Sequence, residues 1–149
     1  MISNPAYAYR QTEVQSRSPL ELVVLLYDGA LRFLAAAEDG FARGDIAARR
    51  QATSRLLAIV SELQATLDVE RGGDIAISLD ELYAYMTRRI VEATVTHSAA
   101  PLHDVRRVLE MLRGAWQELA QSAPAPARGV DSAVLAGRPA MTPQAAGVR

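Results

Sequence analysis

The chain offers few of the side chains that catalysis or metal binding requires. It contains two histidines, His97 and His103, and neither cysteine nor lysine occurs among its 149 residues. Asp104 is adjacent to His103 in sequence and therefore points to another side of a helix, so solvated histidines are a better interpretation than a metal pair. The missing residue types also exclude disulfides, thiolate chemistry, a phosphate-loop lysine and a Schiff-base lysine.

Other chemically suggestive patterns also have simpler explanations. Gly72-Gly73 lacks the strand, turn and helix of a phosphate loop, and no Glu-x-x-His pair is present for a di-iron bundle. Asp80 and Glu81 are adjacent, so their carboxylates diverge on a helix. We therefore predict a protein that is not an enzyme and that requires no cofactor.

Two arginine pairs, Arg88-Arg89 and Arg106-Arg107, raise the possibility of phosphate contacts. All 16 basic residues are arginines, but the formal net charge of the chain is -1. Residues 122–149 hold three arginines and one aspartate, which leaves 13 basic and 16 acidic residues in the rest of the chain. Paired arginines commonly flank the apolar stripe of a helix and cover it with their stems, so we predict no binding to nucleic acid.

The elements that carry these residues are four predicted helices with short connections. The first runs from Pro19 to Phe41, because Ser18 is a cap, Pro19 fits the first helical position and Glu21 completes a capping box. The motif Arg43-Gly44-Asp45 breaks this helix, and its aspartate caps the second. The second helix is predicted to end at Gly72-Gly73, since paired glycines destabilise a helix.

The third helix is predicted to begin at Asp74 and the fourth at Pro101. Both have apolar residues at spacings of three and four, which place them on one face. The expected core positions are Ile75, Leu79, Leu82, Met86, Ile90 and Ala93 in the third helix and Leu102, Val105, Leu109, Leu112, Trp116 and Leu119 in the fourth.

The expected architecture is an all-α, antiparallel up-and-down four-helix bundle over residues 18–121. An extended arm, 1–17, precedes it, and a Pro-, Gly- and Ala-rich disordered tail, 122–149, follows. The longest apolar run is shorter than the roughly 18 residues of a membrane span, and the first residues lack a signal-peptide pattern. With no cysteine present, we expect a cytoplasmic protein without a membrane span.

The first helix has apolar residues on two sides. One stripe consists of Leu20, Val23, Val24, Tyr27, Leu31 and Leu34, and the second of Leu22, Leu26, Gly29 and Phe33. One stripe can face the bundle, whereas the second needs a neighbouring helix, the arm or another protein to cover it. A smaller strip on the fourth helix, Val108, Met111 and Ala115, is a further candidate surface, as is Tyr85, which falls about 100° from the core stripe that Tyr83 adjoins.

Several segments together resemble a known family. They are NPAYAYRQTEV at 4–14, LYDGALRFL at 26–34, VSEL at 60–63, the glycine pair, LYAYMTRRIVEA at 82–93 and LRGAW at 112–116. In order and spacing they resemble the flagellar secretion chaperone FliS, the export chaperone of flagellin. Gly114 and Thr94 depart from the residues usual in that family, and Leu57 lies where glutamine is frequent.

The resemblance implies a four-helix bundle that binds the disordered C-terminal region of flagellin in hydrophobic grooves. Binding would prevent premature polymerisation and aid delivery to the flagellar type III export apparatus, with export-apparatus or regulatory flagellar proteins as further partners. The arm would cover part of this surface and move aside. The partner-binding candidates are Tyr7, Tyr9, Val14, Leu22, Leu26, Phe33, Leu57, Tyr85, Val108 and Met111. A helical adaptor for another partner and a nucleic-acid-binding bundle are the alternatives.

Overall fold

The computed structural model describes residues 18–122, and these residues form four α-helices and no strand. The helices are α2 (Pro19–Arg43), α3 (Ile46–Ala65), α4 (Val69–Thr96) and α5 (Ala100–Ser122). The predicted all-α class is confirmed. The expected arm and all but the first residue of the expected tail lie outside the described residues.

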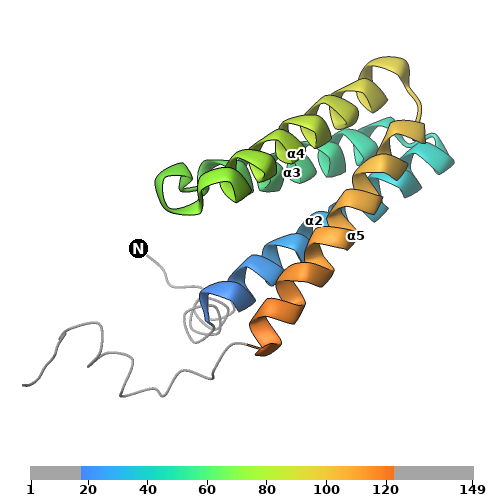
Figure 1. Cartoon of the computed structure of the whole chain (residues 1–149). Helices are drawn as coiled ribbons and strands as arrows, with labels where there is room; N and C mark the ends of the chain where they lie inside the picture. The colour runs from blue at the N-terminus through green and yellow to red at the C-terminus, as the bar shows by residue number, and fades with distance from the viewer. Residues whose placement is uncertain (1–17, 123–149) are drawn as a thin grey trace, which may run out of the picture.

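The helices run alternately up and down, and each packs against its neighbours in a ring. α2 contacts α3 and α5, and α4 contacts the same two helices. The α2–α5 pair and the α3–α4 pair diverge toward the end that carries the start of α2, the α3–α4 turn and the end of α5 (Figure 1). We call this the open end, and the opposite end, with the α2–α3 and α4–α5 turns, the closed end.

Local capping explains where α2 and α3 begin. Ser18 Oγ accepts a hydrogen bond from the Glu21 backbone N–H at 3.2 Å, and Glu21 Oε1 accepts from the Ser18 N–H at 3.0 Å. The helix continues two residues beyond the expected Phe41 and ends at Arg43, where Gly44 adopts a left-handed conformation with φ 68°. Asp45 caps α3 by accepting from the Ala48 N–H at 2.9 Å. The predicted caps of these two helices are confirmed.

The predicted boundary between the second and third helices is wrong. α3 ends at Ala65, and Asp68 already caps α4 by accepting a hydrogen bond from the Arg71 N–H. The glycine pair therefore lies within α4, where Gly73 alone is non-helical, with φ 56° and ψ -132°. An aspartate cap and one helical turn fit before the glycines, so the glycine pair kinks a helix instead of ending one.

The core lies between all four helices. Tyr83, Met86, Ile90 and Ala93 of α4 are buried, as the periodicity predicts. Four expected core residues are only partly buried, namely Leu79, Leu82, Leu112 and Trp116. Two more are exposed: Ile75 is 72% exposed and Leu119 is 52% exposed. Ile75 lies near the start of α4 and Leu119 near the end of α5, so both positions are toward the open end.

A pair of tyrosine hydroxyls is enclosed in the core. Tyr27 Oη of α2 lies 2.5 Å from Tyr83 Oη of α4, and both side chains are almost fully buried. Burial first, and then the neighbouring Tyr83, raise the pKa of Tyr27 far above that of an exposed tyrosine, so this hydroxyl stays neutral. The pair gives each buried hydroxyl a partner across the bundle.

We expect either single change, Tyr27→Phe or Tyr83→Phe, to lower the free energy of unfolding by about 1 to 3 kcal/mol. Each leaves one buried hydroxyl without this partner. The double variant removes both hydroxyls and should lose less than the sum of the two single losses. Urea unfolding of the four proteins measures this coupling, and strictly additive losses would contradict it.

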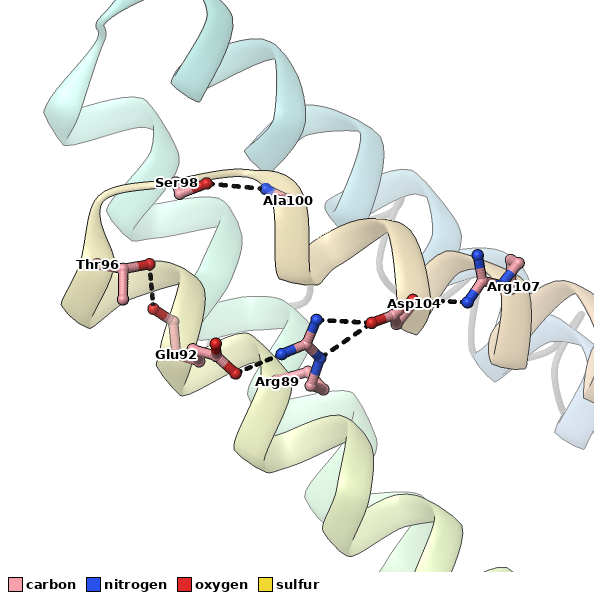
Figure 2. Close-up of polar contacts among 7 residues, drawn as sticks. All are labelled: Arg89, Glu92, Thr96, Ser98, Ala100, Asp104 and Arg107. Atoms are coloured by element: carbon pink, nitrogen blue, oxygen red, sulfur yellow. Dashed lines mark hydrogen bonds and ion pairs between the residues drawn. The ribbon is translucent and has the colours of Figure 1, made fainter.

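Toward the closed end, the helices are joined by charged side chains. Arg89 of α4 donates from Nε and Nη2 to Asp104 Oδ2 of α5 at 3.1 and 2.6 Å, and it also pairs with Glu92. Asp104 Oδ1 accepts from Arg107 at 2.6 Å (Figure 2). Arg106 of α5 pairs with Glu38 of α2. One arginine of each pair, Arg89 and Arg106, therefore joins two helices.

These contacts make the stability of the bundle depend on pH. The hydrogen bond from Arg89, together with the charges of Arg89 and Arg107, lowers the pKa of Asp104. A carboxyl whose pKa is lower in the folded state stabilises the fold above its unfolded pKa of about 3.9 and loses that contribution as the pH falls through its folded pKa. We expect Asp104→Asn to be less stable than the wild type at neutral pH, with a difference that shrinks below about pH 4.

Chemical denaturation of both proteins across this pH range measures the difference. Asp74→Asn, which changes an exposed carboxylate at the open end, is the matched control. A difference between Asp104→Asn and the wild type that is constant with pH would contradict the assignment to the carboxylate charge.

Candidate functional site

A neighbouring helix covers two positions in the second apolar stripe of α2. Gly29 is buried, and a Cβ built there would lie 3.2 Å from Ile59 Cδ1 of α3. Phe33 is half-buried, and the Arg55 guanidinium of α3 lies 5.7 Å from the centre of its ring. The sequence alone left three possible covers for this stripe: a neighbouring helix, the arm or another protein. At these two positions the cover is the neighbouring helix α3.

An apolar groove opens between the four helices at the open end. Its volume is about 360 Å³, more than twice the roughly 150 Å³ of a cavity that accepts benzene. We call it the open-end groove. The residues that line it are Val23, Leu63, Thr66, Leu67, Asp68, Arg71, Gly72, Ile75, Ala76, Leu79, Tyr83 and Trp116.

The groove has a buried floor and an exposed rim. Leu63, Ala76 and Tyr83 form the floor and are each less than 5% exposed. Ile75 is 72% exposed although it lines the groove. A large aliphatic side chain at the edge of an apolar hollow provides contact area for an apolar partner. Its burial is favourable, and it becomes buried only when a partner binds.

The glycine pair shapes one wall of this groove. Gly73 has φ 56°, which a residue with a side chain adopts only with strain. A Cβ at Gly72 would lie 2.8 Å from Ala76 Cβ. The absence of side chains at these two positions lets the first turn of α4 pack against the rest of that helix and places Asp68, Arg71 and Ile75 around the groove.

One wall of the groove comes from a net acidic segment. Residues 68–81, which supply one wall, contain five carboxylates and one arginine. The arginine, Arg71, is 91% exposed and lies 3.6 Å from Asp68. The groove thus combines an apolar interior, lined by one ion pair, with a wall that comes from a net acidic segment, which favours an apolar ligand that carries basic flanks.

The predicted partner-binding residues do not meet in one site. Tyr7, Tyr9 and Val14 lie outside the described residues. Met111 is 61% exposed, and Leu22 is half-buried. The other five are partly buried and pack against the core cluster: Leu26, Phe33, Leu57, Tyr85 and Val108. None of the seven described candidates lines the open-end groove, and their role in partner binding stays a prediction.

Three of these candidates line other surface hollows. Phe33 borders a hollow of about 320 Å³ between α2 and α3, together with charged residues that include Asp39, Arg43 and Arg55. Val108 and Met111 lie in an open hollow on α5 beside Arg107 and Glu110. Charged residues make up a larger share of the lining of both hollows than of the open-end groove, so the groove is the most apolar of these three sites.

The sequence contained the residues of the groove but not their role. Ile75, Leu79 and Trp116 belong to the predicted core stripes of the third and fourth helices. Their periodicity is that of an ordinary bundle helix, and it does not report that the helix pairs diverge at one end. The glycine pair is the available signal, but paired glycines by themselves predict a helix end.

The described residues hold no cluster of three or more potential metal ligands. His97 ends α4 in a left-handed conformation, and its Nδ1 lies 3.0 Å from Arg49 Nη2. Within residues 18–122, no helix is both long and apolar enough to cross a membrane.

Comparison with known proteins identifies the family. The family model described as flagellar protein FliS matches residues 2–123. The flagellar secretion chaperone FliS of Salmonella typhimurium is 37% identical over 121 residues, which cover 79% of this chain and 90% of that protein. The corresponding Bacillus subtilis protein is 31% identical over 121 residues, with 81% and 90% covered, and the Campylobacter jejuni protein is 36% identical over 120 residues, with 80% and 94% covered. The four-helix chain therefore belongs to the FliS family of flagellar secretion chaperones, a family of chaperones and not of enzymes.

Proposed function

We propose that this protein is a cytoplasmic export chaperone that binds the disordered C-terminal region of flagellin. By holding that region, it prevents premature polymerisation and aids delivery to the flagellar type III export apparatus. The observation that carries the proposal is the open-end groove, an apolar site built from all four helices in a member of the FliS family.

The expected mechanism is coupled folding and binding. An amphipathic segment of flagellin lays its apolar face into the groove and becomes helical as it binds. Ordering such a segment costs about 2 to 5 kcal/mol, which burial of apolar surface has to offset. The exposed Ile75 and the half-buried Trp116 are the residues that gain most cover, so they contribute most to affinity in this mechanism.

The arm and the surface hollows extend the proposal. Tyr7, Tyr9 and Val14 would act as a latch over part of the client-binding surface when no flagellin is bound. Phe33, Val108 and Met111 would give a long client further contacts around the bundle. A client that wraps in this way binds a large area with moderate affinity per unit area, which suits a partner that has to be released for export.

Isothermal titration calorimetry of the full chain with a flagellin C-terminal peptide tests the proposal. The expected result is saturable 1:1 binding with a negative heat-capacity change, which is the signature of apolar burial. A peptide of scrambled sequence and equal composition is the control. If the two peptides bind equally, or neither binds, the proposal is wrong and the helical-adaptor alternative becomes the better one.

A further inference from the structure

Both ends of the described chain lie at the open end. Ser122, the last residue of α5, follows Trp116 by six positions, or about 9 Å along a helix axis. Trp116 lines the open-end groove. The chain that continues after Ser122 therefore begins close to this groove.

The C-terminal segment is an addition to the family domain. The family model ends at residue 123, so residues 124–149 lie beyond it. Most of this segment consists of small residues, proline and glycine. Its bulkiest aliphatic cluster is Val130, Val134 and Leu135, and the arginines Arg128 and Arg138 stand on either side.

The tail and the segment that supplies one wall of the groove carry opposite net charges. Residues 123–149 contain three arginines and one aspartate, whereas residues 68–81 contain five carboxylates and one arginine. The aliphatic cluster of the tail matches the apolar lining of the groove. The two flanking arginines outnumber the one aspartate within the cluster, Asp131, so the tail is also suited to the acidic segment.

The connecting chain is long enough to reach the groove. Between Ser122 and Val130 an extended chain spans at most about 29 Å, and it has to return only about 9 Å to come level with Trp116. Because the segment is tethered, its effective concentration at the groove is in the millimolar range for a short flexible linker, so even weak contacts suffice to hold it.

We propose that residues 130–135 dock in the open-end groove of their own chain. Val134 and Leu135 contact Trp116 inside the groove, and Arg128 and Arg138 face the carboxylates of residues 68–81. Any other ligand of the groove then has to displace this segment. The proposal concerns the protein without a client, so it does not depend on flagellin binding.

Trp116 is the only tryptophan in the chain and reports on the groove directly. In the full-length protein, the double change Val134→Asp and Leu135→Asp is expected to shift Trp116 emission to longer wavelength and to speed its quenching by acrylamide. The matched control, Ala145→Asp and Ala146→Asp, adds the same charges farther along the segment and should leave both signals unchanged. Equal signals in all three proteins would overturn the proposal.

Hydrogen exchange gives a second, independent measurement. In the full-length protein, the amides of residues 130–135 should exchange about tenfold more slowly, relative to their intrinsic rates, than those of residues 144–149. The difference should not depend on protein concentration, because the segment and the groove belong to one chain. Unprotected amides, or protection that appears only at high concentration, would refute intramolecular docking.

The N-terminal arm is the competing occupant. If Tyr7→Ser and Tyr9→Ser change Trp116 emission while the double change at Val134 and Leu135 does not, the arm fills the groove and the proposal is wrong. If the tail variant alone changes emission, the assignment to residues 130–135 stands.

Discussion

Ile75→Asp is expected to weaken binding of the flagellin C-terminal peptide at least about tenfold, which corresponds to about 1.4 kcal/mol. Ile75 lines the open-end groove and is 72% exposed in the free protein. A carboxylate there would have to be desolvated against an apolar client. Because the side chain is exposed before binding, the free energy of unfolding should change by no more than about 0.5 kcal/mol. Calorimetry and urea unfolding measure the two quantities.

Ile77→Asp is the matched control for this change. Ile77 is also an exposed isoleucine of α4, 46% exposed, but it does not line the groove. The Ile77→Asp change adds the same charge two residues further along α4, so a general electrostatic effect on peptide binding would appear in both variants. Equal affinities of the two variants would show that the client does not use the open-end groove, even if it binds elsewhere on the bundle.

Gly40→Ala is expected to destabilise the bundle by about 1 to 3 kcal/mol. Gly40 of α2 is buried against Arg49 of α3, and an added Cβ would lie 2.8 Å from both Arg49 N and Arg49 Cβ. Backbone atoms cannot turn away as the end of a flexible side chain can, so the two helices would have to separate. That separation would also disturb Arg49, whose guanidinium lies 4.6 Å from the centre of the Phe41 ring. Chemical unfolding measures the loss.

Gly114→Ala is expected to change the free energy of unfolding in the opposite direction in the same experiment. Gly114 lies within α5, and an added Cβ there would meet nothing within 4 Å. Replacement of a helical glycine by alanine without a clash should stabilise the protein by about 0.5 to 1 kcal/mol. A Gly40→Ala variant that gains stability as Gly114→Ala does would contradict the close approach of α2 and α3.

The helix ends show where local sequence is sufficient. Ser18, Glu21 and Asp45 act through hydrogen bonds to backbone groups three residues away, so their role depends on nearby sequence alone. The central core positions of α4 and α5 were also predictable, because a 3.6-residue period brings them to one face whatever the neighbouring helix is.

The glycine pair shows where local sequence is insufficient. Paired glycines are compatible with a helix end, a separate turn or a kink, and all three use a positive φ. Which of them forms depends on whether another cap precedes the glycines. Asp68 provides that cap, and this moved the start of α4 ahead of the predicted Asp74.

By itself, the sequence determined the helical class, most of the caps, the central core stripes and the resemblance to flagellar secretion chaperones, because each depends on short spacings or on a matching set of segments. The tertiary structure alone decided that Gly29 and Phe33 face α3, that Ile75 is exposed, and that Trp116 lines a groove. The physical reason is that a helical stripe records only which residues share a face. Whether that face meets another helix or opens into a groove depends on the angle at which the helix pairs diverge, and no single helix encodes that angle.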